Sequence, residues 1–191
     1  MLHITSINFK NYKTFKQFSV TFTEFNILVG PNNAGKSTII GALKILAEGL
    51  RKARSRKPVL ISGPTKNQVL GYEIDLNEVP VATENVFHNY DDESPAIVRY
   101  RLSNNSHLQI FFPSQGTCYM ICECPSKIIR SPKDFKENFY LDIGFVPILG
   151  PVEHKEPLYQ EEAARLALLT KRNILGRFWL SGVVSNADLY Y

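Results

Sequence analysis

The segment that most constrains this chain reads "GPNNAGKS" over residues 30–37 and matches the pattern G-x-x-x-x-G-K-S in full. The run "FNILV" before it is apolar apart from Asn26, which is typical of a buried strand, and apolar residues recur at helical spacing after it. A strand, a tight turn and a helix in this order surround a phosphate with backbone N–H groups and a helix N-terminus. The segment therefore predicts nucleoside triphosphate binding, most simply of ATP, within an α/β fold.

Each position of the motif has an expected role. Lys36 is expected to reach the β- and γ-phosphates, and the Ser37 hydroxyl to bind Mg²⁺. The remaining residues expected to line the phosphate site are Gly30, Asn32, Asn33, Ala34, Gly35 and Thr38, of which Thr38 faces the α-phosphate. An ordinary turn with an exposed lysine is the alternative, but such a turn requires neither both glycines nor the lysine.

Composition and charge exclude few classes of protein. The chain has 191 residues, 44% of them hydrophobic, and this is enough to bury a core. The N-terminal stretch "MLHITSINFK" has no apolar region after a basic start, and no apolar run approaches the ~20 residues of a membrane span. We therefore expect a cytoplasmic protein. The net charge of +4 permits a nucleic-acid surface without requiring one.

The periodicity of apolar residues predicts a mixed region of strands and a helix, then a block of antiparallel strands, and then a return to a mixed region. Strands are expected at "LHITSINF" and "QFSVTF" before the motif, and at "VLGYEIDL" and "TCYMICEC" after it. A hairpin is expected at 96–112 with its turn at 103–106, followed by a short helix at "SPKDFKENF", a strand at "FYLDIGFVPIL" and a helix at 156–172. The polar stretch "PVATENVFHNYDDESP" is expected to be a loop. These elements predict a P-loop core over 1–60, an inserted antiparallel β-subdomain over 61–138, and a return to the core over 139–191.

The three cysteines lie close together in the sequence, at 118, 122 and 124. Their shared parity puts them on one face of a strand, about 6.6 Å apart for neighbours two residues apart. Zinc requires sulfur ligands within roughly 4 Å of one another and a further ligand that is not nearby in sequence. A buried face of reduced thiols is the simpler interpretation.

The residues around the motif, "ITSINFKNYKTFKQFSVTFTEFNILVGPNNAGKSTIIGAL", resemble the N-terminus of ABC-type P-loop ATPases of the RecF, SMC and OLD group. Asn33 stands where SMC heads usually carry glycine, and the form "PNNAGKST" is more similar to OLD-type AAA family ATPases. Asparagine tolerates the left-handed backbone region best among the other residues, so this departure is mild. The resemblance implies the N-terminal half of an ABC-type head, with Lys10 near the nucleotide and a Q-loop around "GPVEHKEPLYQ", where Gln160, Glu153 and His154 are candidates.

Two motifs of the group are not recognisable in these residues. No run of four apolar residues ends in Asp-Glu, so a Walker B pair is missing, and "LSGVVS" at 180–185 has Val183 where the signature sequence has its second glycine. The chain is therefore expected to be the N-terminal portion of a longer ATPase. Hydrolysis by the whole protein is favoured but not required by these residues.

The basic run "RKARSRK" after the first helix allows two interpretations. It can contact a DNA backbone, or it can be a solvated helix end whose charges complement the terminal carbonyl groups. Lys13 and Lys16 add to the positive charge.

Two function hypotheses follow. The first is a DNA-associated ATPase head that dimerises, or forms a higher oligomer, around ATP; the resemblance adds a partner or fused nuclease and a role in DNA repair or antiphage defence. The second is a nucleotide-gated assembly or sensor module that binds ATP with little hydrolysis. No membrane partner is expected.

Overall fold

The computed structural model describes residues 2–79 and 85–145. Residues 2–143 belong to one compact unit built on a seven-stranded sheet, with strand order β2-β1-β5-β6-β7-β4-β3. The strands are β1 (Ile4–Tyr12), β2 (Phe15–Thr21), β3 (Val59–Ser62), β4 (Gln68–Glu73), β5 (Ala96–Leu102), β6 (His107–Phe112) and β7 (Tyr119–Glu123). The helices are α1 (Lys36–Ala53) and α2 (Pro132–Asn138), with short 3-10 turns η1 (Leu76–Glu78) and η2 (His88–Tyr90).

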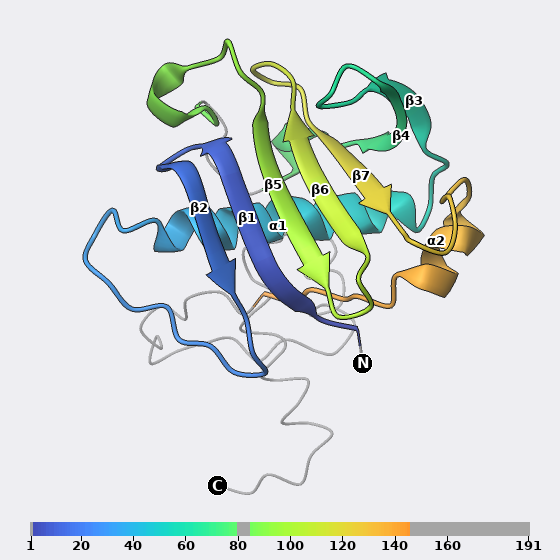
Figure 1. Cartoon of the computed structure of the whole chain (residues 1–191), viewed down its shortest axis with the longest axis horizontal. Helices are drawn as coiled ribbons and strands as arrows, with labels where there is room; N and C mark the ends of the chain where they lie inside the picture. The colour runs from blue at the N-terminus through green and yellow to red at the C-terminus, as the bar shows by residue number, and fades with distance from the viewer. Residues whose placement is uncertain (1, 80–84, 146–191) are drawn as a thin grey trace, which may run out of the picture. The chain divides into compact units, whose positions relative to one another are not determined.

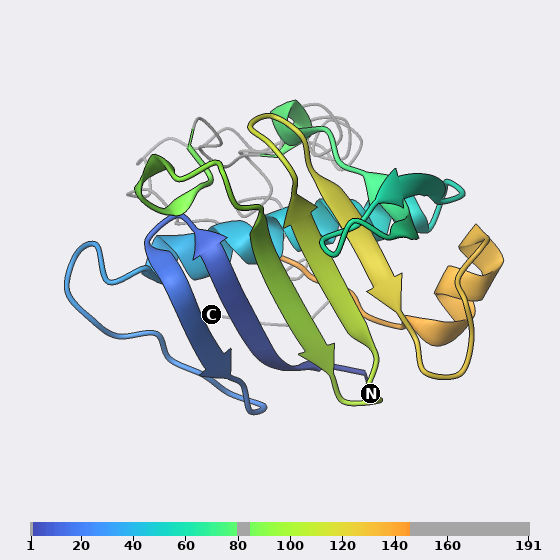
Figure 2. The ribbon, with the colours of Figure 1, turned by 45° about the horizontal axis from the view of Figure 1, so that its top comes forward.

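Every pair of neighbouring strands in this sheet is antiparallel. Helix α1 lies across one face of the sheet, as Figures 1 and 2 show from two directions. An antiparallel sheet covered by a helix confirms the α/β class. None of the described helices is long and apolar enough to cross a membrane.

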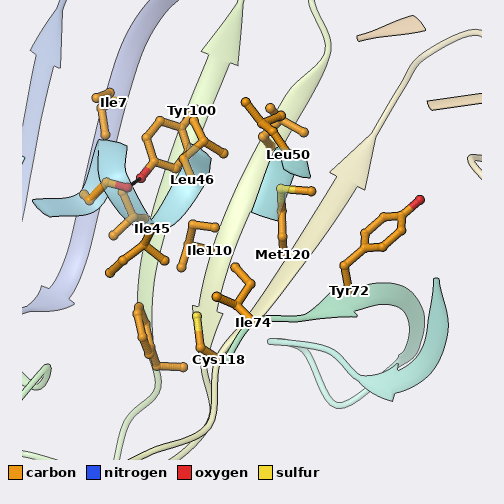
Figure 3. Close-up of a cluster of buried hydrophobic side chains, with 14 of the residues drawn as sticks. Ile7, Ile45, Leu46, Leu50, Tyr72, Ile74, Tyr100, Ile110, Cys118 and Met120 are labelled. Atoms are coloured by element: carbon orange, nitrogen blue, oxygen red, sulfur yellow. Dashed lines mark hydrogen bonds between the residues drawn. The ribbon is translucent and has the colours of Figure 1, made fainter. Parts of the chain in front are cut away.

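Alternate residues along the strands are buried, and these residues form the face of the sheet that α1 covers. Ile7, Val98 and Ile110 are fully or nearly fully buried, and the register aligns Ile7 with Tyr100 and Val98 with Ile110. Directly paired residues share a face of the sheet, so these strands present one continuous apolar surface. Figure 3 shows Ile45, Leu46 and Leu50 of α1 meeting side chains of β5, β6 and β7 in this core.

Glycine lets α1 approach the sheet at one point. A Cβ atom on Gly49 would lie 2.7 Å from the Sδ atom of Met120 on β7. Met120 is fully buried, so the missing side chain of Gly49 leaves the space that the methionine fills.

Most expected elements are confirmed. The strands expected at "LHITSINF", "QFSVTF", "VLGYEIDL" and "TCYMICEC" form, as do the long helix after the motif and the short helix at 132–138. The β5–β6 hairpin forms with its turn at 103–106, as expected. Strand β3 was not predicted, because no alternation of apolar and polar residues marks it in the sequence. The predicted boundaries at residues 60 and 138 stay predictions, and strands from both sides of residue 60 lie in this one sheet.

Two predicted strands are wrong within the described residues. The run "FNILV" at 25–29 forms no strand, and the side chains of Phe25, Ile27 and Val29 are 79%, 71% and 86% exposed. A buried parallel strand needs hydrogen-bonding neighbours, and no described strand pairs with this run. Residues 139–145 likewise form no strand, although Phe139 and Leu141 pack into the core. The rest of that predicted strand and the predicted helix at 156–172 lie outside the described residues.

Candidate nucleotide site

The loop of residues 30–35 leads directly into α1, which begins at Lys36. Gly35 precedes the helix with φ 88°, in the left-handed region that glycine adopts without strain. A Cβ atom at this position would also lie 2.2 Å from Cζ of Phe15 at the start of β2. The second glycine of the motif is therefore required both by its backbone angle and by the ring packed against it.

Asn33 is the second left-handed residue of the loop, with φ 67°. Asparagine tolerates this conformation better than other residues with a side chain, as the sequence suggested. The Ala34 N–H donates to the carbonyl oxygen of Pro31 at 3.3 Å. These features close residues 31–34 into a tight turn ahead of the helix.

The Lys36 ammonium folds back over this turn. Its Nζ atom donates to the carbonyl oxygens of Gly30 at 2.5 Å and Pro31 at 2.6 Å. These oxygens are neutral acceptors, whereas a phosphate oxygen carries charge and forms the stronger hydrogen bond with an ammonium group. The lysine is thus held within the loop in a position from which it can turn to an anion.

Ser37 and Thr38, the predicted metal and phosphate contacts, lie in the first turn of α1. Ser37 is exposed, whereas Thr38 is 7% exposed and its Oγ1 lies 3.3 Å from Oγ1 of Thr14. Thr14 lies in the turn between β1 and β2, so this contact joins the tip of the hairpin to the start of α1.

A cavity of about 640 Å³ lies beside the first turns of α1. Three segments line it: the β1–β2 turn, one side of α1 and the loop before β5. Its residues are Lys13, Thr14, Ser37, Thr38, Ile40, Gly41, Lys44, Asn85, Phe87, Asn89 and Tyr90. Figures 1 and 2 both show the loop before β5 beside the tip of the β1–β2 hairpin.

Asn11 fastens this loop to the hairpin. Its Nδ2 atom donates to the carbonyl oxygens of Asp91 at 2.8 Å and Ser94 at 2.7 Å, and its Oδ1 accepts from the His88 N–H at 3.2 Å. Main-chain contacts add to this, because the Lys13 N–H donates to the Val86 carbonyl oxygen at 2.8 Å. Asn11 is 7% exposed, so three of its hydrogen bonds are made at a largely buried position.

The sequence did not reveal this part of the site. Residues 85–90 were expected only to be a loop, since they have no periodicity and no motif. The contacts that bring them to the tip of the β1–β2 hairpin join residues far apart in the chain, and no local pattern reports such pairings. The single available signal was the polar residue Asn11 at the end of an otherwise alternating strand.

The electrostatics of the site favour an anion. The first turn of α1 contains no acidic residue, and its N-terminus carries the positive end of the helix dipole. Lys13 and Lys44 line the cavity, and no carboxylate is among the described residues that line it. Residues 30–36 of the loop do not line the cavity, but the helix dipole and Lys13 favour negative charge at the end of the cavity near Ser37, where α1 begins.

Other predicted site residues lie elsewhere. Lys10 is exposed in β1, where it pairs with Gln17 and Ile97, and it does not line the cavity, whereas Lys13 does. Gln160, Glu153, His154 and the run at 180–185 lie outside the described residues.

Mg²⁺ would fit the site through few protein atoms. Across residues 2–79 and 85–145 no group of three His, Cys, Asp or Glu side chains could hold a metal ion. Mg²⁺ commonly keeps several waters and binds one or two protein groups together with phosphate oxygens. The exposed hydroxyl of Ser37 at the start of α1 suits that mode of binding.

Much of the basic run is engaged in ion pairs within the chain. Arg51 pairs with Glu48 at 2.5 Å and with Glu78 at 2.7 Å, and Arg54 pairs with Asp142 at 3.1 Å. Arg56 and Lys57 are exposed. These contacts favour the interpretation of the run as a helix end with local partners.

Comparison with known proteins gave two findings. A family model described as an AAA ATPase domain matches residues 2–143. A protein of Helicobacter pylori named "ATP/GTP phosphatase" is 30% identical over 111 residues, which are 56% of this chain and 27% of that protein. The chain thus spans about a quarter of the length of that relative.

Proposed function

Because the chain belongs to the AAA ATPase domain family, we propose that it binds MgATP at residues 30–38 and is part of an ATP-hydrolysing head of the RecF, SMC and OLD group, closest to the OLD type. One observation carries the proposal: the G-x-x-x-x-G-K-S loop joins α1 through the left-handed Gly35, and Lys36 lies over the turn. Loop N–H groups and a helix N-terminus are what a triphosphate requires.

The residues of the loop and of the first turn of α1 have separate roles in binding the nucleotide. The Lys36 ammonium exchanges the carbonyl oxygens of Gly30 and Pro31 for phosphate oxygens and neutralises their charge. The Ser37 hydroxyl is the protein ligand of Mg²⁺, and the first-turn N–H groups of α1 hold the remaining phosphate oxygens. Mg²⁺, when bound, offsets the charge that develops on the phosphates during transfer. Together these residues orient the triphosphate for attack by water.

Hydrolysis is favoured over a purely structural use of ATP. The name of the H. pylori relative, "ATP/GTP phosphatase", describes hydrolysis of a nucleotide. The wider assignments extend beyond the loop: a dimer or higher oligomer with ATP between two heads, an associated nuclease, and action on DNA in repair or antiphage defence. They rest on the resemblance around residues 4–43 and on the net charge of +4.

The test compares Lys36→Ala with Lys16→Ala in the complete polypeptide. Lys16 is an exposed lysine of β2 and serves as a control for loss of charge. We expect Lys36→Ala to raise the Kd for MgATP about 100-fold, because two charged hydrogen bonds of about 1.5 kcal/mol each are lost, and to abolish phosphate release. Unchanged ATP affinity and turnover in a folded Lys36→Ala variant would refute the proposed site.

Further measurements on the complete polypeptide distinguish ATP hydrolysis from ATP-dependent assembly. Phosphate release that rises when duplex DNA is added, together with DNA affinity that falls with salt, supports the DNA-directed ATPase. Oligomers that form with ATP and persist without phosphate release support the nucleotide-gated assembly module instead.

A further inference from the structure

The cavity extends well beyond what a triphosphate chain needs. It begins at Ser37 and Thr38 in the first turn of α1 and continues along the same side of the helix past Ile40 and Gly41 to Lys44. Phosphates gather at the N-terminus of the helix, where its N–H groups point. A group joined to the phosphate chain near Thr38 would therefore enter the rest of the cavity.

The loop before β5 contributes an aromatic side chain to this space. Tyr90 lines the cavity yet is 81% exposed, so most of its ring surface is uncovered. The other aromatic residue of the lining, Phe87, is 2% exposed and belongs to the core. Tyr90 is thus the aromatic residue of the lining with a face available to a ligand.

The remaining lining suits a flat, partly polar ligand. Ile40 on α1 is 43% exposed and offers apolar surface, while Asn85 and Asn89 bring amide groups that can both donate and accept hydrogen bonds. A cavity volume of about 640 Å³ falls within the usual range of small-molecule sites, roughly 300–1,000 Å³.

We propose that this cavity receives the nucleoside of the bound triphosphate, with the Tyr90 ring stacked on the base and Lys13 beside the junction of ribose and phosphate. The inference rests on the proposed function of the nucleotide loop and adds residues that neither motif nor family match assigns. Stacking accepts any base, so the site is expected to hold adenine or guanine nucleotides.

Hydrogen bonds anchor the chain on both sides of Tyr90, at His88 and at Asp91. Tyr90 and Asn89 both have left-handed backbone angles, with φ 62° and 51°. The Asn11 side chain is hydrogen-bonded to the main chain of His88 and Asp91, which flank these two residues. The Nδ1 atom of His88 lies 2.9 Å from the Lys13 carbonyl oxygen. Because the backbone at Tyr90 is anchored on both sides, less backbone entropy is lost when its ring stacks on a ligand.

The test separates the nucleoside from the phosphates. Calorimetry on the complete polypeptide with Mg²⁺ would measure the affinity for ATP and for inorganic tripolyphosphate, which carries three phosphates and no nucleoside. The variants are Tyr90→Ala, Tyr90→Phe and, as a control, Tyr140→Ala, which removes a tyrosine that is 72% exposed and outside the cavity lining.

We expect Tyr90→Ala to weaken ATP about tenfold and to leave tripolyphosphate unchanged, as loss of one stacked base predicts. Tyr90→Phe keeps the ring and should bind ATP like the unaltered protein, as should Tyr140→Ala. Equal loss of ATP and tripolyphosphate, or no loss of ATP, in Tyr90→Ala would overturn the nucleoside site alone. An unaltered protein that binds neither compound would overturn the nucleotide loop itself, and the nucleoside site with it.

Discussion

The hydroxyl of Tyr100 on β5 donates a hydrogen bond of 2.8 Å to the main-chain carbonyl oxygen of Ala42 in α1. Both residues are buried, and burial raises the pKa of Tyr100 well above its ordinary value, so the hydroxyl remains a donor. A helix carbonyl that accepts from the sheet fixes the position of α1 along its axis. The nucleotide loop is attached to the start of that helix and is positioned with it.

Tyr100→Phe should lower the free energy of unfolding by about 1–2 kcal/mol, because the Ala42 oxygen loses a buried partner. Urea denaturation measures the change. Tyr12→Phe is the matched control: Tyr12 is equally buried, and its hydroxyl makes no hydrogen bond to the part of the chain that the structure describes. That variant should be neutral or slightly stabilising, and equal losses in the two variants would contradict the role of the Tyr100 hydroxyl.

Gly35→Ala should destabilise the protein by roughly 2–4 kcal/mol and abolish ATP binding, since the added Cβ meets both a left-handed backbone and the Phe15 ring. Thermal unfolding and ATP titration provide the readouts. In Gly116→Ala the backbone is also left-handed, with φ 78°, but a Cβ meets nothing within 4 Å. The control should therefore lose only about 1 kcal/mol.

A second substitution separates the two causes at Gly35. Phe15→Ala in the Gly35→Ala background removes the ring that the new Cβ would strike, and part of the lost stability should return. Strictly additive losses would show that the ring contributes nothing to the requirement for glycine.

Asn11→Ala should release the loop before β5 and lower the free energy of unfolding by about 2–4 kcal/mol, because three hydrogen bonds at a largely buried position are lost. Hydrogen exchange should show faster exchange of the His88 amide, which donates to Asn11. Asn105→Ala is the control, because Asn105 also has a left-handed backbone, with φ 61° against 49° for Asn11, but lies in an exposed turn. Unchanged protection at His88 in Asn11→Ala would contradict the anchoring role.

Asp134 at the start of α2 should titrate at a pKa of about 2. The Lys127 ammonium at 2.5 Å and the Ser131 hydroxyl at 2.7 Å both stabilise the carboxylate, with Lys127 the larger influence. Because the folded pKa lies below the usual value near 4, this carboxylate stabilises the fold above pH 4, and the contribution disappears as pH falls through about 2.

Carbon-detected NMR titration of the Asp134 carboxyl group measures this pKa directly. Lys127→Met should raise it toward the usual value, whereas Lys57→Met removes a lysine of the basic run and should leave it unchanged. An Asp134 pKa near 4 in the unaltered protein would contradict the contacts described for α2.

The sequence predicted the parts of the site that depend on neighbouring residues. The loop, the helix that starts at Lys36 and the left-handed Asn33 follow from a motif in which every constraint is local. The hairpin of β5 and β6 follows from period-two alternation around a polar turn.

What the sequence could not predict depends on distant partners. The run at 25–29 has the composition of a buried strand, but burial requires neighbouring strands, and composition does not supply them. Tyr90 joins the site through Asn11, and no periodicity links a loop to a strand end so far away in the chain.

The pairing of β1 with β5 determines when the sheet can be completed during synthesis of the chain. Ile7 pairs with Tyr100, so β1 cannot complete its second edge until β5 has left the ribosome, long after the nucleotide loop and α1 have emerged. The hairpin of β1 and β2 can form at once, whereas closing the sheet must wait for a pairing of high contact order. During synthesis the nascent chain therefore carries its nucleotide loop and α1 before the sheet that α1 covers is complete.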